Sequence, residues 1–95
     1  MVRMTFWNVA ERDLERFPHA LRKILLLGCR EIFDDWGIGK MLTGSLSGYR
    51  MHGSTSLTTS RVSVYRVIYV VKGSSHIEIV AIGHRRDIYE RVKKR

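Results

Sequence analysis

The stretch YRVIYVVKGSSHIEIVAIGHRRDIY, residues 65–89, decides the fold. Residues 61–71 are rich in β-branched and aromatic side chains, and residues 77–82 are apolar, so both segments are predicted to be strands. Between them, Gly73, Ser74 and Ser75 are residues typical of a tight turn. The stretch therefore predicts a long antiparallel hairpin at the centre of a sheet.

The remaining elements follow from the same two periodicities, helical and alternating. They are a strand over residues 2–7, helices over 8–17 and 18–36, a short strand over 49–52 and a helix over 85–95. Asn8 followed by Glu11 resembles a capping box, and Pro18 suits the first turn of the second helix. Residues 37–48 hold four of the eight glycines and are predicted to be a loop. We therefore expect a single α+β domain over residues 1–95, with the order β-α-α-β-β-β-α, an N-terminal helical hairpin and a small, antiparallel-rich twisted sheet.

The charge is large and unevenly distributed. Lys and Arg number 17 against 9 acidic residues, a formal net charge of +8. Residues 1–48 carry 7 basic and 6 acidic side chains, net +1, whereas residues 49–95 carry 10 and 3, net +7. Such an excess serves to bind phosphate, an anionic membrane or an acidic protein. We therefore expect an anion-binding surface on the strands and the C-terminal segment.

Other features narrow the class of protein. No apolar run approaches the roughly 18 residues of a membrane span, and Cys29 is the only cysteine, so no intrachain disulfide forms. We expect a cytoplasmic protein without a membrane role. Met41 follows Gly39 and Lys40 where a phosphate loop requires Ser or Thr, so no nucleotide site is predicted. The histidines show no metal-ligand spacing, and we expect neither metal nor cofactor.

Strand periodicity selects the first candidate site residues. Tyr49 and Met51 alternate with Arg50 and His52, so we expect the first pair to be buried and the second pair to face outward together. Arg66 lies within an apolar strand, where it is costly unless it is paired or faces a groove.

The candidate site residues from Arg66 onward could also have purely structural roles. Arg66 could instead form an ion pair with Glu78 across the sheet. Arg85 and Tyr89, four residues apart, share a helical face. His84 and Arg85 also suit a role in holding the last helix, and Tyr89 suits one as cover for the core.

The order of these segments resembles the RelE/ParE superfamily of toxin-antitoxin toxins. The likeness rests on residues 42–50 (LTGSLSGYR), 65–69 (YRVIY), 77–82 and 83–89 (GHRRDIY). It implies a ribonuclease that cleaves messenger RNA, on the ribosome in the best-known members, and that a partner antitoxin silences. Arg66, Arg85 and Tyr89 then match the strand arginine, the arginine after the last strand and the tyrosine of the nuclease branch.

The sequence also departs from the pattern of that branch. Arg50 and His52 replace two lysines, the connection over residues 53–60 is longer, and Tyr89 follows Arg85 by fewer residues than in the family.

The expected reaction is attack of a ribose 2′-OH on the adjacent phosphate, which needs a base, an acid and cations but no metal. The predicted catalytic residues are His52, Arg66, His84, Arg85 and Tyr89. Arg66 and Arg85 hold the phosphate, His52 or His84 acts as base or acid, and Tyr89 stacks on a base or shares in proton transfer. The residues predicted to bind RNA phosphate are Arg50, Arg61 and Arg86. Two other functions remain open: a ParE-like, non-enzymatic inhibitor of DNA gyrase, and a basic nucleic-acid-binding module.

Overall fold

The computed structural model describes residues 2–53 and 65–95. Its strands are β1 (Arg3–Phe6), β2 (Lys40–Met41), β3 (Arg50–His52), β4 (Tyr65–Lys72) and β5 (His76–His84). Its helices are α1 (Asn8–Glu15), α2 (His19–Asp34) and α3 (Ile88–Lys93), with the 3₁₀ turns η1 (Trp36–Ile38) and η2 (Gly44–Leu46). None of the helices in these two ranges is long and apolar enough to cross a membrane.

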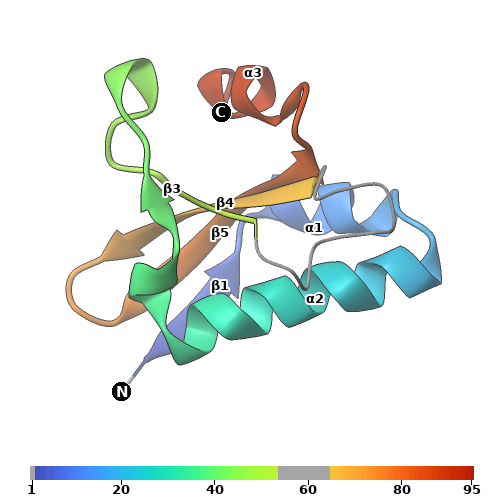
Figure 1. Ribbon diagram of the computed structural model, residues 1–95, viewed down its shortest axis with the longest axis horizontal. Helices are drawn as coiled ribbons and strands as arrows, with labels where there is room; N and C mark the ends of the chain where they lie inside the picture. The colour runs from blue at the N-terminus through green and yellow to red at the C-terminus, as the bar shows by residue number, and fades with distance from the viewer. Residues whose placement is uncertain (1, 54–64) are drawn as a thin grey trace.

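The five strands form one sheet in the order β1-β5-β4-β3-β2. β1 runs parallel to β5, and the other neighbours are antiparallel. The hairpin of β4 and β5 lies at the centre, and Gly73 in its turn has φ +64°, a conformation that favours glycine. Figure 1 shows α2 along one face of the sheet and α3 on the other. The predicted α+β class and the central hairpin are confirmed.

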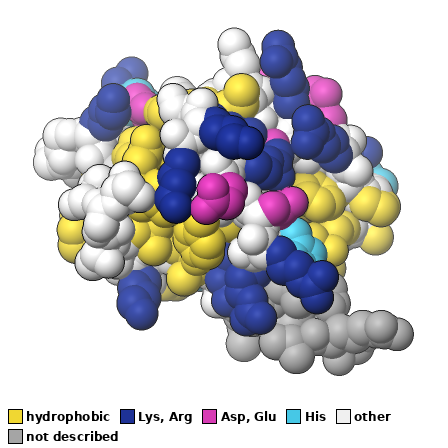
Figure 2. All heavy atoms as spheres, turned by 90° about the horizontal axis from the view of Figure 1, so that it is seen from above, with side chains coloured by type: hydrophobic (Ala, Val, Ile, Leu, Met, Phe, Trp, Pro, Cys, Tyr) yellow, Lys and Arg dark blue, Asp and Glu magenta, His cyan; other side chains and the backbone are white. Residues whose placement is uncertain are grey.

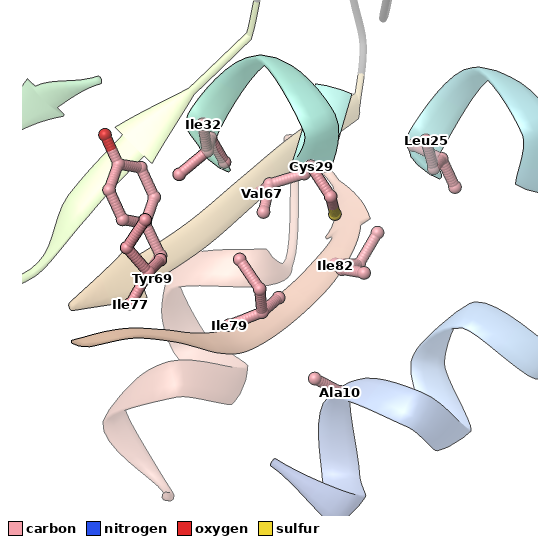
Figure 3. Packing of buried hydrophobic residues seen from close by; sticks show 9 residues of the cluster. All are labelled: Ala10, Leu25, Cys29, Ile32, Val67, Tyr69, Ile77, Ile79 and Ile82. Atoms are coloured by element: carbon pink, nitrogen blue, oxygen red, sulfur yellow. The ribbon is translucent and has the colours of Figure 1, made fainter. Parts of the chain in front are cut away.

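Alternating side chains of the central hairpin build a separate core on each face. Toward α1 and α2, the sheet contributes residues such as Val67 and Tyr69, which pack with Leu25, Cys29 and Ile32 of α2 (Figure 3). Toward α3, the core consists of Leu46, Ile68, Val80, Ala81, Ile88 and Val92. Both faces of the sheet are therefore covered, because the period of two supplies an apolar row to each.

The segment predicted as a loop is more ordered than expected. Residues 37–48 contain β2, η2 and most of η1. The Tyr69 hydroxyl accepts a hydrogen bond from the Gly39 N–H at 2.9 Å and donates one to the Trp36 carbonyl at 2.7 Å. A core tyrosine therefore fixes this segment beside the sheet, a long-range contact that local composition does not encode.

The first helix begins at Asn8 as predicted, but its predicted cap needs correction. The N-cap of α1 is Trp7, and no side chain caps the helix, so Asn8 and Glu11 form no capping box. The Trp7 N–H still donates to the Ile79 carbonyl at 2.9 Å, because β1 passes into α1 without a loop.

Candidate nucleic-acid interface

The sheet divides the predicted site residues between its two faces. Arg50 and His52 lie opposite Tyr69 and Val67, on the face covered by α2. Tyr89 packs against the core on the α3 face. Arg66 alternates with Val67, so its side chain also belongs to the α3 face. The structure therefore brings Arg66 and Tyr89 to one side of the sheet and places Arg50 and His52 on the other.

His52 is buried rather than outward-facing. Its side chain is 4% exposed, and its Nε2 lies 2.8 Å from Oε1 of Glu31 in α2. The expectation that His52 faces outward was wrong. Alternation correctly placed it on the same face as Arg50, but that face is the one that α2 covers.

Arg50 supports the segment that follows α2. Its Nη1 donates to the Gly39 carbonyl at 3.1 Å, and its guanidinium lies 5.5 Å from the centroid of the Trp36 ring. Cation–π contact of this kind stabilises both groups. Arg50 is thus half-buried and holds η1 against the sheet, so the expectation that it faces outward was wrong as well.

Arg66 lies in a row in which glycines flank it on both sides. Gly83 of β5 is its partner in register, and Gly53 directly follows the paired His52 of β3. A Cβ atom added to Gly53 would lie 2.7 Å from the Arg66 Nη1, so the guanidinium occupies the space of a missing side chain. The same Nη1 donates to the Tyr65 carbonyl at 3.0 Å. The absence of a side chain at Gly53 thus makes room for the Arg66 guanidinium.

The alternative that pairs Arg66 with Glu78 does not fit the register. Glu78 lies opposite Val70, four residues further along β4, a distance of about 13 Å along a strand. The Glu78 carboxylate accepts a hydrogen bond from the Trp7 indole N–H at 3.0 Å.

The turn after β5 carries three of the predicted residues. The His84 Nδ1 accepts a hydrogen bond from the Arg86 N–H at 3.2 Å, so the neutral ring carries its proton on Nε2. The His84 ring packs edge-on against Tyr65, with centroids 5.7 Å apart. His84 therefore shapes the turn, as the structural alternative predicted, while Arg85 and Arg86 are exposed.

The sequence patterns did not predict the buried ion cluster around Asp13. Asp13 of α1 is 1% exposed and accepts hydrogen bonds from the guanidinium groups of Arg91 and Arg95 and from the Ile82 N–H. A sequence signal existed, since Asp13 follows the buried Ala10 by three residues, on the same helical face. Its two arginine partners, from the end of the chain, left no such signal.

The candidate interface is an open surface. In the described part of the chain there is no enclosed pocket. Figure 2 views the molecule from the α3 side, where dark blue Lys and Arg side chains are spread over the face among a few acidic ones. Arg61, predicted to bind phosphate, lies outside the described residues.

Comparison with known proteins gives structural matches only. No protein-family model and no curated protein sequence matches the chain. The toxin-antitoxin complex RelBE2 from Mycobacterium tuberculosis matches with a TM-score of 0.71 and 20% identity, over 88% of this chain and 98% of that one. The isolated RelE toxin of E. coli matches with a TM-score of 0.68 and 18% identity, over 99% and 97%.

A third solved structure extends the likeness to archaea. The RelB-RelE antitoxin-toxin complex from Methanococcus jannaschii matches with a TM-score of 0.62 and 23% identity, over 92% of this chain and 96% of that one. All three matches cover most of both chains. The chain therefore has the fold of the RelE toxins.

Proposed function

We propose that this protein is the toxin of a toxin-antitoxin pair and that it acts as an endoribonuclease on messenger RNA. The fold supports the first part, because the similar structures include RelE toxins alone and in complex with antitoxins. The observation that carries the second part is Arg66, whose guanidinium lies on the α3 face over Gly53, with Gly83 as its register partner.

The cations of this face suit a phosphate that gains charge. Attack of a ribose 2′-OH produces a phosphorane-like transition state with extra negative charge on its oxygens. A guanidinium stays protonated and offers paired N–H groups to two such oxygens. Arg66 supplies this group from the sheet, and the exposed Arg85 and Arg86 supply further cations from the turn that follows β5.

Proton transfer is the second requirement. His84 directly precedes Arg85 and is half-buried, and its hydrogen bond to the Arg86 N–H leaves Nε2 as the proton-bearing nitrogen. In the proposal, His84 acts as acid for the leaving 5′-oxygen in its imidazolium form, which gives up the Arg86 N–H bond when Nδ1 takes a proton. Tyr89 stacks on a base or shares in proton transfer. His52 could serve as base only after leaving its contact with Glu31, so the contacts favour His84.

The partners follow from charge. A net charge of +8 favours association with RNA and with ribosomes, whose surface is rich in phosphate. It also favours an antitoxin with acidic or apolar segments that covers the α3 face and silences it. Cleavage of mRNA on the ribosome is therefore part of the proposal.

Primer extension on messenger RNA after brief induction tests the activity. We expect discrete new 5′ ends with the wild type and a loss of about 10²-fold or more with Arg66→Ala, the scale seen when a charge-stabilising group is removed. The matched control is Arg30→Ala, which removes the same charge from a 70% exposed arginine on α2 and should leave cleavage intact. A translation extract with and without ribosomes tests the ribosome requirement.

Other outcomes separate the alternatives. Growth arrest with intact RNA would favour a gyrase inhibitor of the ParE type, and RNA binding without cleavage or toxicity would favour a simple binding module. Full growth on induction without an antitoxin would contradict both toxin functions. Should His52→Ala and His84→Ala each leave cleavage intact, the assignment of proton transfer to histidine would be wrong.

A further inference from the structure

A second guanidinium lies in the same row as Arg66. A Cβ atom added to Gly83 would lie 2.8 Å from Nη1 of Arg91, so Arg91 of α3 fills the space of the side chain that Gly83 lacks. Gly83 is the register partner of Arg66. The row therefore reads Gly53, directly after β3, then Arg66 of β4 and Gly83 of β5, with one guanidinium over each glycine.

Asp13 fixes Arg91 in this place. The carboxylate is 1% exposed, while the Arg91 side chain remains 25% exposed. The same carboxylate accepts two hydrogen bonds from Arg95, each of 3.0 Å. One negative charge thus faces two guanidinium groups, and the cluster keeps one net positive charge.

The Asp13 cluster binds the edge of β5 beyond the point where its pairing with β1 ends. The pairing of β1 with β5 ends at Phe6 and Ile79, and the Trp7 N–H donates to the Ile79 carbonyl. Beyond Ile79, the backbone groups on this edge of β5 need other partners. Asp13 accepts the Ile82 N–H at 3.1 Å, and the Arg95 Nη1 donates to the Val80 carbonyl at 2.8 Å. Because these bonds hold Asp13 to the sheet itself, the Arg91 guanidinium is fixed relative to Arg66.

We propose that Arg91 is a second phosphate-binding residue of the interface and that Asp13 is its positioning residue. Arg66 and Arg91 then contact the backbone of a single RNA strand that crosses the glycine row. The two glycines matter because a Cβ at either position would collide with the guanidinium group that lies over it. This inference rests on the proposed function, since it assigns a further residue to the same RNA-binding face.

The salt dependence of binding tests this proposal without requiring cleavage. The probe is a fluorescent 2′-O-methyl RNA oligonucleotide, which lacks the attacking hydroxyl, and the readout is its anisotropy between about 50 and 200 mM salt. Each phosphate contact on a single strand contributes about 0.7 to the slope of log K against log salt. We expect Arg66→Gln and Arg91→Gln each to lower the slope by about this amount.

Two controls separate contact from folding and from bulk charge. Arg30→Gln removes an arginine of an exposed Asp–Arg pair on α2 and should keep the wild-type slope. Arg95→Gln removes the other guanidinium of Asp13, with a comparable effect on stability, and should also keep it. If Arg91→Gln does not fold, Arg91→Lys retains the charge without the planar fork, and we expect several-fold weaker binding.

The results distinguish the role of Arg91 from the proposed function of the whole face. A slope lowered by Arg66→Gln but not by Arg91→Gln would overturn the role of Arg91 and leave the proposed function standing. An equal effect of Arg91→Gln and Arg95→Gln would also overturn it, because the loss would then come from the Asp13 cluster as a whole. A wild-type slope in both Arg66→Gln and Arg91→Gln would overturn the proposed RNA-binding face itself.

Discussion

Replacing Asp13 by asparagine should destabilise the protein far more than its position on a short N-terminal helix suggests. The change keeps the size of the side chain and one oxygen that can accept the Ile82 N–H. It removes the charge that holds Arg91 and Arg95, and with it the ionic link between α1, β5 and α3.

The magnitude follows from burial. Removing one partner of a buried ion pair costs about 3–5 kcal/mol. Arg91 and Arg95 are 25% and 15% exposed, so each can turn partly into water after the change. We therefore discount the loss to about 2–3 kcal/mol, a large part of the roughly 5–15 kcal/mol that stabilises a domain. The midpoint of thermal unfolding should fall by about 10–20 °C.

Urea unfolding followed by tryptophan fluorescence measures this free energy directly. The matched control is Asp34→Asn, which breaks an i, i+4 pair with Arg30 whose side chains are 58% and 70% exposed. That pair should contribute only about 0.3–0.5 kcal/mol, and less at high salt. A loss below about 1 kcal/mol for Asp13→Asn would refute the reasoning, because it would show that the buried cluster contributes no more than a surface pair.

Two further predictions concern the core on the α2 face. Tyr69→Phe should lower the free energy of unfolding by about 1–3 kcal/mol, because the buried Gly39 N–H loses its acceptor and the Trp36 carbonyl loses a donor; a change within 0.5 kcal/mol of zero, roughly the error of such measurements, would contradict it. Burial raises the pKa of the Cys29 thiol from 9.0 to about 12. The folded state holds this proton more tightly than the unfolded state does, so the protonated thiol contributes to the free energy of unfolding. This contribution is complete below pH 9.0 and is lost as the pH rises toward about 12, where the free energy of unfolding falls by at most about 1.4 kcal/mol per pH unit. Urea midpoints measured across that range should therefore fall more steeply with pH for the wild type than for Cys29→Ala. Equal slopes would contradict the assignment of this pH dependence to Cys29.

Much of the fold was predictable because its signals are local. The apolar alternation of β4 and β5, with Gly73 between them, predicts the central hairpin without knowledge of its partners. The helical spacing of α2 likewise predicts an amphipathic helix. The ordered segment between α2 and β3 was not predictable, because the hydroxyl of Tyr69, thirty residues away from Gly39, holds it in place.

The same distinction between local and long-range signals applies to the candidate site. The sequence selected Arg66, Arg85 and Tyr89 as candidates, since an arginine within an apolar strand and a tyrosine four residues after an arginine are conspicuous in the chain. It could not decide which face of the sheet each side chain occupies. Both faces are covered, and a period of two shows which residues share a face without showing which helix lies over it.

The amino-acid sequence by itself determined the order of the helices and of every strand except β2, the central hairpin, the basic C-terminal half and the resemblance to the RelE toxins. Only the tertiary structure decided that His52 is buried against Glu31 and that Asp13 gathers Arg91 and Arg95 from the far end of the chain. The physical reason is that periodicity and composition act between near neighbours. Ion pairs and close packing over glycine, in contrast, depend on residues that meet only after the sheet has formed.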